Sequence, residues 1–236
     1  MLKVVNQNKT IYTPTDQTYT KLLLHGNNLL DYSGNAHVVT ANGDATFNNS
    51  GNPFGNGGVI SIDGDGDYFT IPDSPDLDFG TGDFVIDFWL KRHGVSQDGG
   101  ILGASINTPL GYIVHFSYVS TDTLIFSSTA SGSFTDDIIF NTAVTDETWT
   151  HIAIVRDGNT LRTFQNGASA GTLDVTGYVF DSSGDGLVLG RYYTNVTGNY
   201  ADIDLAELRI YKGGNNNWTG STIDIPTKPY ALGSFN

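Results

Sequence analysis

Asp63, Asp65 and Asp67 alternate with glycine in the stretch DGDGDY. Oxygen ligands at every second residue can converge on one Ca²⁺ where the backbone folds back between them, and glycine permits such a fold. An EF-hand needs a glutamate at the twelfth position of its loop, where this chain has Ser74, so that motif is excluded. The aspartates leave two interpretations open: ligands of a calcium ion, or ordinary turn residues.

The segments on either side of these aspartates alternate between two kinds of side chain. Residues 59–63, 68–71 and 84–90 each show a period of two, which is typical of half-buried β-strands. Glycine, proline and aspartate separate these segments and predict turns. Similar signals predict further strands in residues 21–30, 36–39, 45–47, 101–104, 111–119, 123–128, 135–141, 148–156, 161–164 and 187–191. The sequence therefore predicts an all-β fold.

Several of these segments carry a recognisable pattern. They include SIDG, GDYFTIP and GDFVIDFW, the hairpin WTHIAIVRDG followed by FQNG, and a closing LRI strand with a KG turn, a tryptophan and two later prolines. Over about residues 21–230 they resemble the laminin G-like branch of the concanavalin A-like lectin and glucanase superfamily. Phe164 stands where that family often has tyrosine, and Ala206 replaces the first residue of an acidic pair, which leaves Glu207 alone. The closing block looks like that of phage-borne members.

The resemblance implies a two-sheet antiparallel jelly-roll sandwich of the concanavalin A-like, laminin G-like kind. We expect one domain over residues 21–236, ending in a C-terminal strap. Residues 1–20 are polar and are expected to form an N-terminal arm or linker outside the core. Such an arm can add a strand to a neighbouring subunit, so it is the predicted contact with other virion proteins.

Sugar binding is the activity that the resemblance implies, and many laminin G-like domains also hold a structural or ligand-bridging calcium. A sugar site needs a flat aromatic ring with polar groups around it. Tyr192, Tyr193 and Tyr200 lie in a segment rich in asparagine and threonine and are the predicted ligand-binding residues. By the same resemblance, Asp31 in the turn DYSGN joins the aspartates of DGDGDY as a metal candidate.

Other aromatic residues and histidines are expected to have structural roles. Trp89 and Trp149 lie on alternating strands and Trp218 in the strap, so packing is favoured over sugar contact. His25 and His37 have no second histidine or cysteine nearby, which favours packing or surface positions over metal ligation.

The segment DIDLAE contains the carboxylates that most resemble those of an enzyme: Asp202, Asp204 and Glu207. Family-16 glucanases of the same superfamily carry an E-x-D-x-x-E strand, whose first and last carboxylates act at a separation of about 5 Å. Here the first residue is aspartate, one methylene shorter, and the segment coincides with the closing strand. We therefore predict that the protein is not an enzyme, with a glucanase-like hydrolase as an alternative. The motifs G-x-S-x-G and H-E-x-x-H, the phosphate loop and cysteine pairs are absent.

The amino-acid composition limits the classes of binding partner that can be expected. The 236 residues contain 25 acidic and 11 basic side chains, for a net charge of -14, and no cysteine. Such a chain repels phosphate backbones and anionic membranes, so nucleic acid and membrane insertion are not expected. No apolar run resembles a signal peptide or a transmembrane segment.

The resemblance to phage-borne members, with which the absence of cysteine and of a signal peptide is consistent, implies a protein made in a host cytoplasm and carried on a bacteriophage virion surface, as a capsid protein or a tail-fibre appendage. The predicted role is adhesion to a cell-surface glycan, as a lectin. A capsid-decoration protein without a ligand is a second interpretation, and a homo-oligomer stays open.

Overall fold

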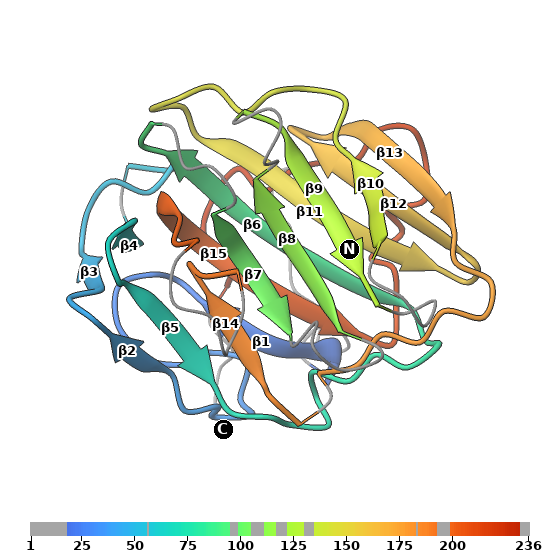
Figure 1. Cartoon of the computed structure of the whole chain (residues 1–236), viewed down its shortest axis with the longest axis horizontal. Coiled ribbons are helices and arrows are strands. Elements are labelled where there is room, and N and C mark those ends of the chain that lie inside the picture. Colours follow the sequence, from blue (N-terminus) through green and yellow to red (C-terminus); the bar gives the residue numbers. More distant parts are fainter. Residues whose placement is uncertain are drawn as a thin grey trace, which may run out of the picture.

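A computed structural model describes residues 18–55, 57–94, 99–104, 111–116, 122–129, 135–182, 184–192 and 199–231, with the backbone alone for residues 135–137. These residues form two antiparallel sheets that lie face to face (Figure 1). One sheet has the order β13 (Ala168–Asp174), β12 (Thr160–Gln165), β11 (Thr150–Asp157), β6 (Phe84–Arg92), β15 (Asp202–Lys212), β4 (Val59–Asp63) and β3 (Thr46–Asn48), and β1 (Thr20–Leu24) also pairs with β15. The other has the order β10 (Thr135–Ile139), β9 (Leu124–Ser128), β8 (Tyr112–Phe116), β7 (Gly100–Ala104), β14 (Leu187–Leu189), β5 (Tyr68–Ile71) and β2 (Thr40–Asn42). The predicted jelly-roll sandwich is confirmed.

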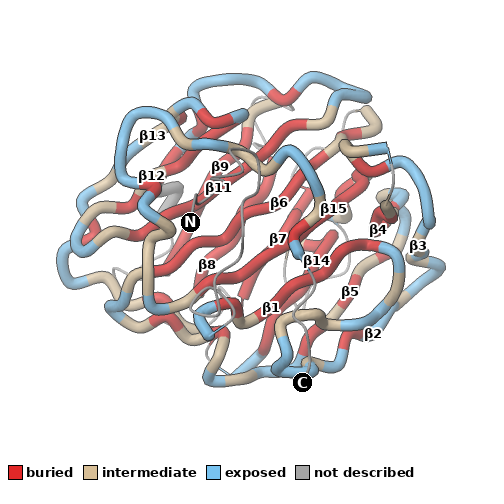
Figure 2. Tube along the Cα trace, turned by 180° about the vertical axis from the view of Figure 1, so that it is seen from behind, coloured by how far each residue is buried: buried red, intermediate tan, exposed pale blue. Residues whose placement is uncertain are grey.

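The core lies between the two sheets because alternate residues of each strand point inward. On β6 the inward residues are Phe84, Ile86 and Phe88, which join a single large cluster with Val114 and Phe126 from the opposite sheet. Figure 2 shows the buried segments running along the strands of both layers, while the exposed segments lie in the connecting loops and in the edge strands β2, β3 and β13. Burial of this apolar surface is the main stabilising contribution to such a fold.

The outer face of the eight-stranded sheet is also buried, which alternation alone does not predict. Residues 213–231, the C-terminal strap, follow β15 and run across this face without forming a named strand. Trp218 of the strap packs with Val85 and Val155, and Ile225 packs with Trp89. The strap therefore supplies a second, thinner apolar layer.

β15 is the strand on which this sheet converges. One edge pairs with β6, while the other pairs first with β4 through residues 202–205 and then with β1 through residues 208–211. The register shifts between Ala206 and Arg209, and Glu207 adopts a φ of 53° at this bulge. The bulge thus lies where β15 changes partners.

The element boundaries differ from expectation in small ways. Short strands occupy 40–42 and 46–48 in place of the expected 36–39 and 45–47, and β1 starts at Thr20, inside the segment predicted as an arm. The remainder of that arm, residues 1–17, lies outside the described residues. Within the described part of the chain, no helix has the length and apolar character needed to cross a membrane.

Candidate functional site

The first candidate site is a tyrosine–arginine cluster, which we define as Tyr68, Arg191, Tyr192 and Tyr200. Phe69 and Ile71 of β5 point into the core, so Tyr68, which alternates with them, points outward and is partly exposed. The Arg191 guanidinium carbon lies 3.9 Å from the centroid of the Tyr68 ring. The cluster therefore contains a close cation–π contact at the surface of the seven-stranded sheet.

Tyr200 is distant from Tyr68 in the sequence but lies beside it in the fold. It forms β-bridges with Gly100 and with Arg191. Its ring centroid lies 6.2 Å from that of Tyr68, with 30° between the two ring planes. Both rings are partly exposed, so they present neighbouring aromatic surfaces to solvent.

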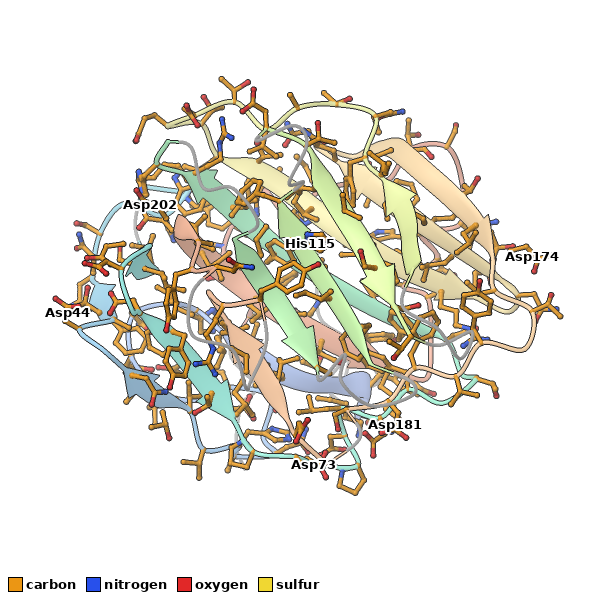
Figure 3. All side chains as sticks on the ribbon, in the orientation of Figure 1. Asp44, Asp73, His115, Asp174, Asp181 and Asp202 are labelled. Atoms are coloured by element: carbon orange, nitrogen blue, oxygen red, sulfur yellow. The ribbon has the colours of Figure 1, made fainter. Side chains whose placement is uncertain are left out.

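Tyr192 is positioned by a buried histidine on β8. The ring of Tyr192 meets the ring of His115 edge to face, with 4.7 Å between centroids. His115 Nδ1 lies 2.9 Å from the carbonyl of Phe116, and Nε2 lies 2.8 Å from the Ser127 hydroxyl (Figure 3 labels His115). Nδ1 donates to the carbonyl, and the two contacts together fix the orientation of the His115 ring.

The structure places two of the three tyrosines that the sequence analysis proposed as ligand-binding residues. Tyr192 and Tyr200 both belong to the cluster, whereas Tyr193 lies outside the described residues. Sequence reasoning missed Tyr68 and Arg191. The outward position of Tyr68 could have been found from its alternation with Phe69, but its distance from Tyr200 in the chain concealed their contact.

The second candidate site is a carboxylate cluster, Asp44, Asp63 and Asp67, at the end of the sandwich where Figure 3 labels Asp44 and Asp202. One oxygen from each of its three side chains lies within 4.8 Å of the others. The Asp44 backbone N–H donates to Asp67 Oδ1 at 2.7 Å, which ties the β2–β3 turn to the turn before β5. The cluster lines a hollow of about 380 Å³ whose other walls include Thr46, Ser61, His93 and Asp202.

The electrostatics of this hollow favour a cation. Burial raises the pKa of Asp67, and the negative charges of Asp63 and Asp44 raise it further. Burial likewise raises the pKa of Asp202 against the opposing effect of His93. Carboxylate oxygens are the ligands that Ca²⁺ prefers, so the donor set fits a calcium ion.

The predicted metal residues divide between two places. Asp63 and Asp67 meet in the carboxylate cluster, and Asp65 is exposed beside them with its N–H donating to Asp63 Oδ1 at 2.9 Å. Asp44 was missed because it lies in a different turn. Asp31 is not a member of the cluster.

Asp31 instead holds its own turn together. Its carboxylate accepts hydrogen bonds from the N–H groups of Leu23, Ser33 and His37 and contacts His37 Nδ1 at 2.7 Å. Burial opposes ionisation, but these contacts lower the pKa of Asp31. His37 therefore has the structural role expected of it.

The carboxylates of DIDLAE do not form an open catalytic pair. Asp204 is bound by Lys91 Nζ at 2.7 Å and by His93 Nε2 at 3.1 Å. Glu207 is 1% exposed, and its two oxygens each lie 2.9 Å from His25 Nδ1. Asp202 lines the hollow of the carboxylate cluster together with His93. A retaining glycosidase needs two carboxyl groups facing one substrate cleft, and Glu207 faces buried protein groups.

Comparisons with solved structures show the same fold. Domain 4 of AbnA, an extracellular arabinanase from Geobacillus stearothermophilus solved in complex with arabinotriose, is 18% identical with a TM-score of 0.63, over 83% of this chain and 93% of that one. The botulinum neurotoxin serotype D binding domain is 14% identical with a TM-score of 0.66, over 86% of this chain and 50% of that one. A third structure comes from work on botulinum neurotoxin type C, whose cell entry depends on interaction with two ganglioside molecules. It is 16% identical with a TM-score of 0.63, over 85% of this chain and 50% of that one.

The chain thus spans about half the length of the toxin structures that it matches. No curated protein sequence matched the chain. A family model described as the concanavalin A-like lectin/glucanases superfamily, Laminin_G_3, matches residues 63–214. This match covers more than half of the sequence and includes every residue of the tyrosine–arginine cluster, whereas Asp44 of the carboxylate cluster lies before it. The chain belongs to the laminin G-like family of the concanavalin A-like lectin and glucanase superfamily.

Proposed function

We propose that the protein is a non-catalytic recognition module that binds a cell-surface glycan through the tyrosine–arginine cluster. The observation that carries this proposal is the paired placement of Tyr68 and Tyr200, two partly exposed rings 6.2 Å apart. Aromatic faces stack on the C–H face of a sugar, and neighbouring rings can contact successive sugar units.

Polar groups for the sugar hydroxyls lie on the same outer face. Thr70 follows Tyr68 by two residues on β5, and β2 places Thr40 opposite Thr70 and Asn42 opposite Tyr68. The Asn42 amide lies 3.5 Å from the Thr70 hydroxyl, a separation at the limit of a hydrogen bond. Because the hydrogen bond between them is weak, the Asn42 amide and the Thr70 hydroxyl can bind sugar hydroxyls instead.

The comparisons support binding in general. One structure of the same fold is a domain solved with arabinotriose, and others are toxin binding domains. The burial of Glu207 supports a binding role over glucanase activity, because the carboxylate that catalysis would require is already occupied.

The finer assignment to a bacteriophage virion surface is also our proposal, and it rests on the sequence pattern of the closing block. In this proposal the chain is a tail appendage or a capsid component, and residues 1–20 attach it to other virion proteins or to further copies of itself. Deletion of residues 1–17, which leaves β1 intact, tests the attachment: virions are expected to lose the protein while glycan binding is retained.

We further propose that the carboxylate cluster holds Ca²⁺. The ion would be bound by Asp44, Asp63 and Asp67, and it would join the β2–β3 turn to the turn before β5. Calorimetric titration with CaCl₂ is expected to show one site that disappears in Asp63→Asn, whereas Asp65→Asn, outside the cluster, keeps it. Equal loss in both variants would refute this assignment.

Glycan-array binding of the full chain tests the main proposal. Tyr68→Ala and Tyr200→Ala are each expected to weaken binding to the recognised glycan about tenfold, from the usual magnitude of aromatic contacts. Tyr19→Ala is the matched control, since Tyr19 is 38% exposed and contacts the strap side of the domain. If no glycan binds, or if Tyr19→Ala weakens binding equally, the proposal is wrong. If deletion of the N-terminal arm abolishes particle attachment and the full chain binds no glycan, the protein is instead a capsid-decoration protein without a ligand.

A further inference from the structure

Two buried carboxylates lie between the eight-stranded sheet and the C-terminal strap. Asp87, on the outer face of β6, is 0% exposed and accepts a hydrogen bond from Arg209 Nε at 2.7 Å. His151 Nε2 lies 3.3 Å from the same carboxylate, and the Tyr230 hydroxyl donates to it. These charged and polar groups are enclosed by protein, so each depends on its partners remaining in place.

Glu207 makes a matching set of contacts from the bulge of β15. Its carboxylate faces His25 Nδ1 at 2.9 Å and accepts the backbone N–H of Tyr230 at 2.9 Å. Tyr230 therefore contacts both buried carboxylates, one through its hydroxyl and the other through its backbone. It is the point at which the end of the strap is fastened to the sheet.

Other polar atoms beneath the strap have no hydrogen-bond partner among the described residues. They are His25 Nε2, His151 Nδ1 and Trp89 Nε1. His25 shares Glu207 with Tyr230, His151 meets the Trp218 ring at 6.1 Å between centroids, and Trp89 packs with Ile225.

Trp218 and Tyr230 are the only buried residues of the strap, and the described part of the chain shows few further hydrogen bonds from it to the sheet. Asn215 Nδ2 donates to Asp157 Oδ1 at 2.8 Å. The Ile223 N–H donates to the Gly167 carbonyl at 2.8 Å, and the Ser169 N–H donates to the Ser221 carbonyl at 3.0 Å. The strap contributes no strand to either sheet. Segments with few buried contacts and few backbone hydrogen bonds open at lower free energy than the core.

We propose that the C-terminal strap is a latch that opens as a unit while the sandwich stays folded, and that Tyr230 is the residue that keeps it closed. Opening uncovers the apolar outer face around Val85, Val155 and Trp89. This face is separate from the outer face of the other sheet, which carries the tyrosine–arginine cluster. The proposal therefore does not depend on glycan binding.

Hydrogen exchange measured by mass spectrometry on the full chain tests the latch. Tyr230→Phe removes only the hydroxyl that reaches Asp87, and it is expected to raise exchange at residues 221–230 at least tenfold while residues 112–116 and 124–128 exchange as in the parent. Tyr19→Phe is the matched control and is expected to change neither. If the strap and both sheets exchange together in the parent and in Tyr230→Phe, the strap is not a separate unit and the proposal is wrong.

A cross-link provides an independent readout. The chain contains no cysteine, so Ser169→Cys combined with Ser221→Cys introduces one pair at a position where the strap and β13 are hydrogen-bonded. Oxidation of this pair in the Tyr230→Phe background is expected to return strap exchange to the parent rate, and reduction is expected to release it again. If the oxidised protein exchanges as fast as the reduced one, strap opening does not account for the exchange.

Discussion

Replacement of Arg156 by methionine tests how the end of the sandwich opposite the carboxylate cluster is held together. Arg156 is 1% exposed, at the end of β11, and its guanidinium donates to the Val175 carbonyl at 3.5 Å, the limit of a hydrogen bond, and more closely to three other backbone carbonyls. These three acceptors are Gly158 at 3.0 Å, Tyr178 at 3.0 Å and Gly80 at 3.1 Å. Burial lowers the pKa of Arg156, although Asp83 opposes this.

The expected effect follows from those contacts. Arg156→Met keeps most of the buried length but leaves three carbonyls without their donor, at a cost of about 1–3 kcal/mol each. We take the low end, because each carbonyl oxygen has a second lone pair and the substitution also removes the cost of burying a charge. The free energy of unfolding should therefore fall by about 3 kcal/mol, which corresponds to about 6–12 °C in Tm for a chain of this size.

Urea unfolding followed by tryptophan fluorescence measures the change. Arg156→Lys is the matched control, since its ammonium keeps the charge but cannot reach three carbonyls in different directions, so about half of the loss is expected. A loss below about 1 kcal/mol in Arg156→Met would show that water replaces the guanidinium and that the carbonyl contacts do not hold these loops. Equal losses in both variants would show that the planar fork, rather than the charge, is what matters.

Two further predictions concern the buried acid and the turn glycine. Burial opposes ionisation of Asp87, but Arg209 and its other partners hold the pKa of Asp87 below the ordinary 3.8. This contribution to stability is present above that value and is lost as the pH falls through the lower folded pKa, so Asp87→Asn should flatten the fall in stability below about pH 3.8 in urea titrations at several pH values. A parent protein whose stability does not fall in that range would contradict the assignment. Gly43 has a φ of 73°, and a Cβ there would meet the Gly66 carbonyl at 2.7 Å, so Gly43→Ala should lower the free energy of unfolding by about 2 kcal/mol and weaken Ca²⁺ binding. Gly51→Ala is the control, because Gly51 also has a positive φ, of 104°, but a Cβ there meets nothing within 4 Å. If both variants lose Ca²⁺ binding equally, the contact between residue 43 and the Gly66 carbonyl is not the cause.

The strand pattern was predictable because the inward residues follow the pleat. Phe84, Ile86 and Phe88 alternate on β6, and they lie in the core as the period of two indicates. The outer positions were not predictable in the same way. Val85 and Asp87 alternate with these inward residues, so the period of two places them on the outer face of the sheet. Both are nevertheless fully buried, because the strap covers them. Local periodicity reports the faces of a strand and contains no information about a distant segment that covers one of them.

The candidate sites show the same limit. Asp63 and Asp67 were found together because a single turn carries both, whereas Asp44 reaches them from a separate turn. Trp89 and Trp218 pack as expected, each 9% exposed, since bulky aromatic residues are favoured in apolar layers. Tyr68 required the fold, because its partner in the proposed site is far away in the chain. Contacts between distant residues depend on topology, which a single sequence specifies only indirectly.

The bulge at Glu207 has a mechanical consequence. Glu207 joins His25, just after β1, to Tyr230 of the strap, so the first strand of the domain and its C-terminal strap are both held by one side chain on β15. A pulling force applied between residue 20 and residue 230 would be transmitted through the contacts of Glu207 with His25 and Tyr230. The sheet that carries Tyr68 lies outside that path, so the proposed glycan-binding surface would keep its shape while the domain is pulled.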